Sequence, residues 1–257
     1  MRNVIVRHLR NKRASRGQHP GLLLQRYLCE KAAGDDGNPE EKKAILLAAI
    51  NAATNPEVRQ LYDAAYERWK SSLLSTAQTT IVKTLGRLIV GLGSENVTET
   101  GITLHHTFGM PVIPGSALKG LAAHYCHQVW GEQDDRFRMA TEKEDEAYRK
   151  YLAGKRPQPE KDNFHRLLFG NTDDSGCILF HDAWYVPGSD PQPLRRDVMT
   201  PHHKDWLDGR KPPTDFDSPT PVSFLSVRGS FLIALSWCGP DTPAARDWTG
   251  KNHPTPD

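Results

Sequence analysis

Cysteines are few in this sequence, and they lie far apart. The four residues, Cys29, Cys126, Cys177 and Cys238, include no CxxC pair. A disulfide framework or a zinc ribbon needs cysteines in closely spaced sets, so the sequence predicts neither. Scattered free thiols are typical of proteins in a reducing compartment. We therefore expect a cytoplasmic protein.

Long hydrophobic runs are also missing. Apolar residues make up 37% of the 257 residues, and the mean hydropathy is −0.60. No run approaches the roughly 18 apolar residues that a membrane-spanning helix needs. The first residues, MRNVIVRHLRNKR, contain no apolar core like that of a secretory signal. The sequence thus predicts no membrane partner, and enough chain for one large domain or two small ones.

A strong excess of charge of either sign is absent as well. The 33 basic and 31 acidic residues give a formal net charge of +2, which excludes a uniformly basic nucleic-acid binder. The charges are nevertheless uneven, because residues 1–26 contain no acid and seven basic residues: Arg2, Arg7, Arg10, Lys12, Arg13, Arg16 and Arg26. Such an arm can contact phosphates or be a solvated tail, and both interpretations remain open. The acidic excess of residues 132–146 indicates a solvated helix face or a protein contact.

Motifs for nucleophilic or metal catalysis are not found either. The chain has no GxSxG, SxxK or HExxH. His124 and His127 share a helix face at spacing i, i+3, but the sequence places no third and fourth ligand for zinc. We therefore predict no metal and no cofactor. A nuclease that uses His105 or His106 as a general base remains an alternative.

The most informative stretch that is present is PGSALKG at residues 114–120. Gly115 and Gly120 let a backbone approach a ligand closely, a helix N-terminus offers N–H groups to an anion, and Lys119 adds a positive charge. Together they form a candidate phosphate cradle, with Ser116 as the expected N-cap. The spacing of a P-loop is absent. The competing interpretation is an ordinary cap that begins a core helix.

Hydrophobic periodicity and turn residues predict an α+β fold, with one sheet and helices on one face. In the second expected helix, Val58, Leu61, Ala65 and Trp69 recur near helical spacing. Residues 132–163 are expected to be an insertion, and the proline-rich residues 187–221 one long loop. The expected helices are 22–30, 39–53, 56–74 and 117–130, and the expected strands are 81–92, 177–186, 222–227 and 230–238, the last two paired with one another.

Four segments in this order resemble a known family. They are GLGSENVTETGITLHHTFGMPVIPGSALKGLAAHY, FGNTDDSGCILFHDAWYV, DVMTPH and DSPTPV, and they lie within residues 78–238. The first resembles the signature stretch of the RAMP superfamily of CRISPR proteins. The order of all four is similar to the subunit-six family of the type III-B (Cmr) RNA-guided effector complex.

The resemblance implies a ferredoxin-like (RRM-like) RAMP core, which we place over residues 76–238. Charge and periodicity, not the resemblance, predict a basic arm and helical segment over 1–75, and the Pro/Gly/Asp-rich composition predicts a flexible tail over 239–257. It implies a non-catalytic backbone subunit that binds the CRISPR guide RNA near its 3′ end in antiviral defence. The implied partners are the guide RNA, its target RNA duplex and the other Cmr backbone subunits. The expected RNA-binding residues are Gly115, Ser116, Lys119, Gly120, His105, His106, Arg7, Arg10 and Arg13.

Two other functions stay open at this point. A RAMP-type endoribonuclease would use His105, His106 or His124 as a base, or Glu99, which lies near the position of the aspartate of the cutting sister subunits. A protein adaptor would make no RNA contact. Family members usually continue after the last strand into a helix and a second glycine-rich loop, whereas the corresponding stretch here is GPDTPAARDWTGKNHPTPD. This departure from the family implies either a sheet edge that a partner covers or weaker folding of the isolated chain.

Overall fold

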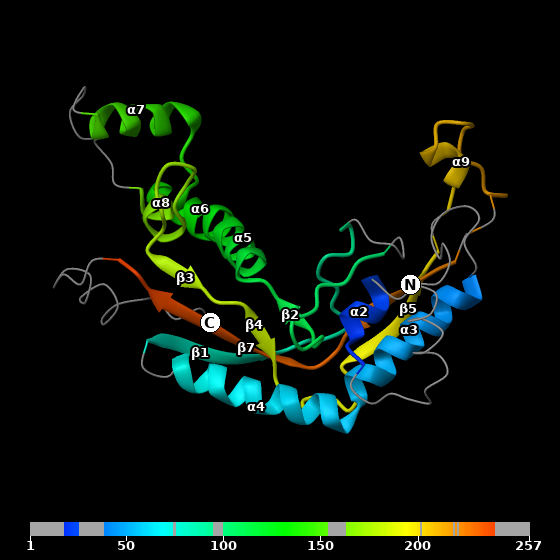
Figure 1. Cartoon of the computed structure of the whole chain (residues 1–257). Helices are drawn as coiled ribbons and strands as arrows, with labels where there is room; N and C mark the ends of the chain where they lie inside the picture. Colours follow the sequence, from blue (N-terminus) through cyan, green and yellow to red (C-terminus); the bar gives the residue numbers. More distant parts are fainter. Residues whose placement is uncertain are drawn as a thin grey trace. The chain divides into compact units, whose positions relative to one another are not determined.

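A computed structural model describes residues 18–25, 39–73, 76–94, 100–153, 163–200, 202–217, 219 and 221–239. The chain forms two compact units. Unit one comprises Met1–Ser72, Thr80–Ile113 and Ala183–Ile233, and unit two comprises Leu73–Thr79, Pro114–Asp182 and Ala234–Asp257. Helices combine with antiparallel strands, as the α+β prediction requires (Figure 1). Among the described helices, none has the length and apolar character needed to cross a membrane.

The helices of unit one are α2 (Pro20–Gln25), α3 (Pro39–Thr54), α4 (Pro56–Leu73, which ends at the unit boundary) and α9 (Lys204–Leu207). Both long helices begin at a proline, which suits a first helical position because its missing N–H needs no partner there. α3 buries Leu46, Ala49, Ile50 and Ala53 at helical spacing. This face packs against the strands β5 (Leu194–Met199) and β6 (Val222–Val227) (Figure 1).

The buried face of α4 differs from the predicted one. Leu61 is 60% exposed, whereas Tyr62 and Tyr66 are buried. The Tyr62 hydroxyl donates to the Tyr185 carbonyl oxygen at 2.7 Å, so the ring is buried with its polar atom satisfied. The sequence pattern favoured the aliphatic Leu61, but the larger tyrosine rings fill the space against the sheet.

The strands are β1 (Ala77–Lys83), β2 (Val112–Ile113), β3 (Ile178–Phe180), β4 (Ala183–Tyr185), β5 (Leu194–Met199), β6 (Val222–Val227) and β7 (Ser230–Trp237). One sheet has the order β1–β7–β4–β2, with β3 also paired to β7. β4 pairs with Phe231–Leu232 of β7 in unit one, and β3 pairs with Leu235–Trp237 of β7 in unit two. β5 and β6 form a second, two-stranded antiparallel sheet.

Several strand predictions are therefore wrong. The expected single sheet is two sheets, and β6 pairs with β5 rather than with β7. The expected loop over 187–221 contains β5 and α9. The expected strand over 177–186 divides into β3 and β4, and the strand expected over 81–92 is instead β1, followed by a bend and a bridge from Leu88 to Val227.

Unit two is built on the helix α5 (Gly115–Tyr125), which continues as a π-helix (η1, Cys126–Trp130) and then as α6 (Gly131–Gln133). A short 3₁₀ turn (η2, Asp135–Phe137), α7 (Glu142–Leu152) and α8 (Phe164–Phe169) follow. The core of this unit contains Cys126, Leu168 and Phe169. The residues packed around that core are Ala122, Ala123, Phe137, Ile178 and Phe180.

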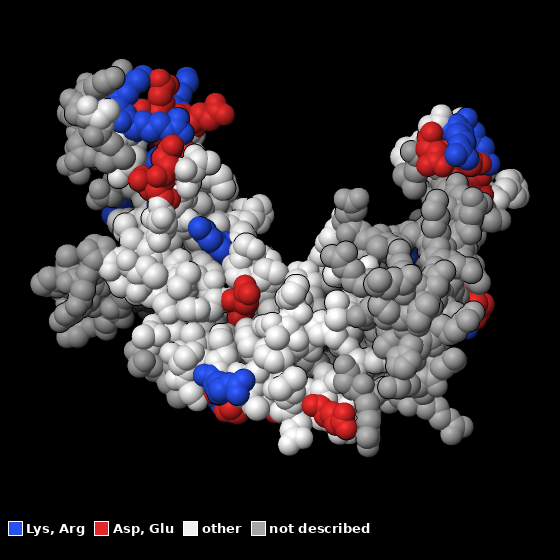
Figure 2. All heavy atoms as spheres, in the orientation of Figure 1, with Lys and Arg blue, Asp and Glu red and all other residues white. Residues whose placement is uncertain are grey.

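The arm, RAMP-domain and tail boundaries expected at residues 75 and 238 stay predictions, as does the ferredoxin-like description of the core. Within the expected insertion over 132–163, the described part contains α7. This helix begins with a capping box, because Glu144 accepts from the Thr141 N–H at 2.7 Å while the Thr141 hydroxyl accepts from the Glu144 N–H at 3.4 Å. Acidic and basic side chains lie intermixed over α7 (Figure 2).

Candidate nucleic-acid interface

The start of α5 is fixed by a carboxylate from the segment between β3 and β4. The Gly115 N–H donates to Asp182 Oδ1 at 2.7 Å. The Pro114 carbonyl accepts from the N–H groups of Ala117 and Leu118 at 2.9 and 3.2 Å. Asp182 thus places a negative charge at the positive end of the helix dipole, which stabilises the helix.

Gly115 is a glycine because the chain approaches it too closely for a side chain. A Cβ on Gly115 would lie 2.1 Å from the Phe180 carbonyl oxygen, well inside van der Waals contact. Gly115 is also buried. We expected a ligand to approach Gly115 closely, but β3 occupies the space beside it. The Gly115 N–H is also already bonded to Asp182.

The exposed residues of the candidate cradle follow Gly115 within the first turns of α5. Ser116, Lys119 and Gly120 are all exposed, and a Cβ on Gly120 would meet no atom within 4 Å. The predicted N-cap role of Ser116 is wrong, because Pro114 occupies that position and the acceptor at the helix start is the distant Asp182. Within the described part of the chain Lys119 has no ion-pair partner, so its ammonium group stays available to an anion.

His105 packs among aromatic rings in unit one. Its ring centroid lies 4.5 Å from that of Trp184 and 4.9 Å from that of Phe108. Its Nδ1 accepts from the Thr107 N–H at 3.2 Å. Trp184 in turn stacks on Trp69, with centroids 4.9 Å apart and planes 6° from parallel. These contacts make His105 part of the packing between α4 and the sheet.

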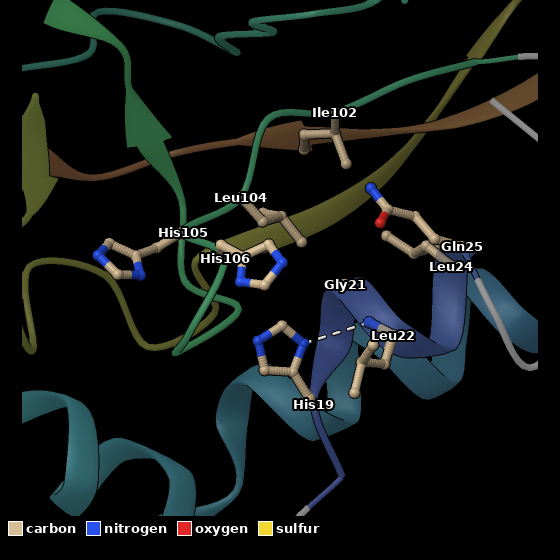
Figure 3. A pocket seen from close by; sticks show the side chains of 9 residues that line it. All are labelled: His19, Gly21, Leu22, Leu24, Gln25, Ile102, Leu104, His105 and His106. Atoms are coloured by element: carbon tan, nitrogen blue, oxygen red, sulfur yellow. Dashed lines mark hydrogen bonds between the residues drawn. The ribbon is translucent and has the colours of Figure 1, made fainter. Parts of the chain in front are cut away.

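His106 is exposed and lines a pocket of about 60 Å³ in unit one. Figure 3 shows the rings of His19 and His106 facing one another across it, while His105 points away. His19 Nδ1 accepts from the Leu22 N–H at 3.2 Å, and its Nε2 is buried with no hydrogen-bond partner among the described residues. Burial is the main reason that the pKa of His19 lies below its ordinary value. The other lining residues are Gly21, Leu22, Leu24, Gln25, Ile102 and Leu104.

A second exposed element of unit one is the segment around α9, residues 202–217. Asp217 accepts from the Thr214 hydroxyl at 2.8 Å and contacts His203 Nδ1 at 2.9 Å. These contacts hold the pKa of Asp217 well below its ordinary value, with the His203 hydrogen bond as the largest cause. The segment exposes two aromatic side chains, Trp206 (53%) and Phe216 (96%). Exposed rings on a polar scaffold are the type of surface on which bases stack.

The nine predicted RNA-binding residues are thus placed unequally. Four of them lie on α5 in unit two: Gly115, Ser116, Lys119 and Gly120. His105 and His106 are consecutive residues of unit one. The arginines of the arm, Arg7, Arg10 and Arg13, lie outside the described residues, as does Glu99. Among the described residues no group of three His, Cys, Asp or Glu side chains could hold a metal ion.

Sequence reasoning missed two polar residues of these sites. Asp182 follows the apolar run CILFH. An aspartate that interrupts an expected strand is a signal that its carboxylate has a structural partner elsewhere, here the start of α5. His19 directly precedes Pro20, the first residue of α2. A histidine just before a helix-starting proline is a candidate N-terminal cap, although histidine is uncommon there.

Comparison with known proteins identifies the class. The family model described as RAMPs, RAMP superfamily, matches residues 81–235, more than half of the sequence. The chain belongs to the RAMP superfamily. Within that superfamily it is similar to CRISPR system Cmr subunit Cmr6 of Pyrococcus furiosus: the two are 31% identical over 212 residues, which is 68% of this chain and 62% of the relative. The chain therefore spans less than two thirds of the length of this curated relative.

One solved structure shares the fold, and a second matches more weakly. A chain in the cryo-EM structure of type III-B Cmr-beta bound to cognate target RNA matches with a TM-score of 0.50 and 19% identity. The match covers 85% of this chain and 69% of that one. The crystal structure of Cmr6 from Pyrococcus furiosus matches with a TM-score of 0.33 and 28% identity, over 63% of this chain and 82% of that one. The recognition of a RAMP protein similar to the Cmr subunit-six family is confirmed.

Proposed function

We propose that this chain is a non-catalytic backbone subunit of a type III-B CRISPR effector complex. It binds the guide RNA near its 3′ end, next to the target RNA duplex and the other Cmr backbone subunits. The proposal extends to this chain the role of the family that its relative Cmr6 represents. Assembly in the cytoplasm remains part of the proposal.

The exposed side of α5 is the observation that carries RNA binding. It combines Lys119, which has no ion-pair partner among the described residues, with two small exposed residues, Ser116 and Gly120, that leave room for a ribose-phosphate backbone. A subunit that must accept any guide sequence needs contacts to phosphate and 2′-hydroxyl groups rather than to base edges.

The surroundings of the candidate bases support a non-catalytic role. A general base needs a lone pair directed at the substrate, but the ring of His105 is packed on Trp184 and Phe108 and its Nδ1 is occupied by the Thr107 N–H. His106 and His124 are exposed and have no carboxylate that orients them among the described residues. Endoribonuclease activity thus remains the weaker alternative.

Lys119→Glu tests the proposal. RNA binding through a few phosphates makes log K fall with log salt concentration, with a slope of about −0.7 per contact on single strands. We expect Lys119→Glu to weaken the binding of single-stranded repeat RNA about tenfold or more at moderate salt and to make the slope shallower by about 0.7. Fluorescence anisotropy across a salt series measures both quantities.

Lys143→Glu on α7 is the matched control. It makes the same charge change at another exposed lysine of unit two. It should leave affinity and slope close to those of the wild type. Equal effects of both variants would indicate non-specific electrostatics, and a flat salt response of the wild type would favour the adaptor function. Defined cuts in the RNA that disappear in His106→Ala would contradict the non-catalytic role.

A further inference from the structure

Two cysteines face one another at the open end of the β3–β7 pairing in unit two. The register pairs Ile178 with Trp237 and Leu179 with Ser236. The next pair outward is Cys177 with Cys238, and the Cys238 N–H donates to the Cys177 carbonyl oxygen at 2.8 Å. Directly opposed residues of an antiparallel pair project from the same face of the sheet. The two thiols therefore share a face.

The spacing of such a pair is compatible with a disulfide. A hydrogen-bonded antiparallel pair has Cα atoms about 5.5 Å apart, and disulfides span Cα separations of about 4.4–6.8 Å. The Cβ atoms of such a pair lie about 5.5 Å apart or slightly less, farther than the about 3.8 Å of a relaxed disulfide. Closure therefore needs a small shift of one strand.

The end of the ladder allows this shift. The Cys177 N–H donates to the Leu167 carbonyl oxygen at 2.8 Å instead of to Cys238, so a single hydrogen bond joins the two cysteines. The turn after Cys238 also brings the chain against the Cys177 thiol, because a Cβ on Gly239 would lie 3.0 Å from Cys177 Sγ. Both cysteines are free thiols in this structure.

We propose that Cys177 and Cys238 form a reversible disulfide that locks the end of β3 to β7 when the chain meets a low-molecular-weight disulfide. Cys238 is exposed and reacts first, whereas Cys177 is partly buried. Burial and the neighbouring Cys238 thiol both raise the pKa of Cys177, which slows its direct reaction with an external oxidant.

The chemistry balances in two exchange steps. The Cys238 thiolate attacks one sulfur of glutathione disulfide, which forms a mixed disulfide and releases one glutathione thiolate. Cys177 then loses its proton to solvent, and its thiolate attacks the Cys238 sulfur and releases the second glutathione thiolate. Two protein thiols are oxidised, and one glutathione disulfide is reduced to two glutathione molecules. Because the link is strained, it should be readily reduced again.

This link would act on the candidate RNA-binding helix. α5 packs against β3, and Gly115 at its start lies against the Phe180 carbonyl of that strand. A covalent tie at the end of β3 therefore restrains the support on which α5 rests. The disulfide itself does not depend on the proposed RNA binding, because it is detected by chemistry alone.

Peptide mapping of the full-length chain tests the proposal. The reduced protein is incubated with glutathione disulfide, blocked with an alkylating agent, digested without reductant and analysed by mass spectrometry. We expect two thiols to be lost, no retained glutathione, and a linked peptide that joins Cys177 to Cys238. Cys126→Ser should give the same link, because Cys126 is buried in the core of unit two.

Two variants separate the steps. Cys177→Ser should leave Cys238 carrying glutathione, and Cys238→Ser should make the reaction of Cys177 about tenfold slower or more. A link to Cys29, a dimer joined through Cys238, or a mixed disulfide that persists at Cys238 in the wild type would each overturn the proposal. The wild-type map decides the matter even where a variant fails to fold.

Discussion

At the residue scale, two glycines five positions apart in one motif have opposite roles. Gly115 is buried against the Phe180 carbonyl, and its N–H is held by Asp182. Gly120 is exposed, and no atom of the described residues lies within 4 Å of a Cβ placed on it. The first glycine therefore supports the fold, and the second leaves surface room for a ligand.

Alanine substitutions separate these roles. Gly115→Ala places a Cβ 2.1 Å from backbone oxygen, so we expect a loss of about 2–4 kcal/mol of stability. Gly120→Ala adds a better helix former at an unobstructed helical site and should be neutral or stabilise by up to about 1 kcal/mol. Urea unfolding measures both changes. Equal stability of the two variants would contradict the packing role of Gly115.

His19 predicts a pH dependence of α2. Its Nδ1 accepts the Leu22 N–H, which only an imidazole unprotonated at that nitrogen can do. Burial keeps the pKa of the folded state below the ordinary value of 6.5. As the pH falls through about 6.5, the unfolded state takes up the proton first, so stability present above this pH is progressively lost below it.

His19→Asn keeps a capping oxygen and removes this titration. We expect the free-energy difference between wild type and variant to shift against the wild type between about pH 7.5 and about pH 5. Urea unfolding across this pH range measures it. A difference that stays constant with pH would show that the His19 ring does not titrate with folding.

At the element scale, the sequence predicted the long helices α3 and α4 well, but it missed the short helices α8 and α9 and predicted the strands poorly. The ends of α3 and α4 were predicted to within about one residue, because Pro39 and Pro56 and the apolar spacing act locally. The pairing of β6 with β5 was missed, because Arg228 and Gly229 suggested a tight hairpin while the true partner lay in a proline-rich stretch read as a loop. The choice of a strand's partner depends on contacts between residues that are distant in sequence. The periodicity of a single segment carries no information about such contacts.

The candidate site shows the same limit. The motif around Lys119 and Gly120 was found because its residue types are unusual in sequence. The partner of Gly115, Asp182, lies 67 positions away and enters only through the fold. His105 was assigned to RNA binding from its position, and the packing of its ring on Trp184 could be learned only from the structure.

The polar contacts that join β5 and β6 to the segment after β1 predict a further stability effect. Asp197 Oδ2 accepts from the Ser226 hydroxyl at 2.7 Å and from Arg87 at 3.1 Å. Ser226 is fully buried. Asp197→Ala removes the acceptor of Arg87 and the shorter acceptor of the Ser226 hydroxyl, which keeps only the Arg195 carbonyl oxygen at 3.5 Å as an acceptor. We therefore expect a loss of about 1–3 kcal/mol in urea unfolding.

Asp208→Ala is the control for this prediction. Asp208 pairs with Arg210 at 3.4 Å near α9, and both side chains are exposed. Its removal should cost less than about 0.5 kcal/mol. If the two aspartate variants lose equal stability, the contacts around Ser226 do not have the role assigned to them.

At the scale of the whole molecule, we propose that a RAMP chain of two units binds a guide RNA. Family membership rests on the match over residues 81–235, and the effector-complex role is extended from a relative of which the chain spans 62%. Lys119 on α5 is the residue whose charge the role needs most. The basic arm at residues 1–26 and the exposed rings of Trp206 and Phe216 supply further candidate contacts.

The most direct test is recovery of the tagged chain from cells that carry a complete type III-B locus, with sequencing of the RNA that comes with it. The account predicts that guide RNAs and several other subunits are recovered with the wild type. Lys119→Glu should recover clearly less guide RNA than Lys143→Glu does. Recovery of the wild-type chain without RNA, or with undiminished guide RNA in Lys119→Glu, would contradict the role assigned to α5.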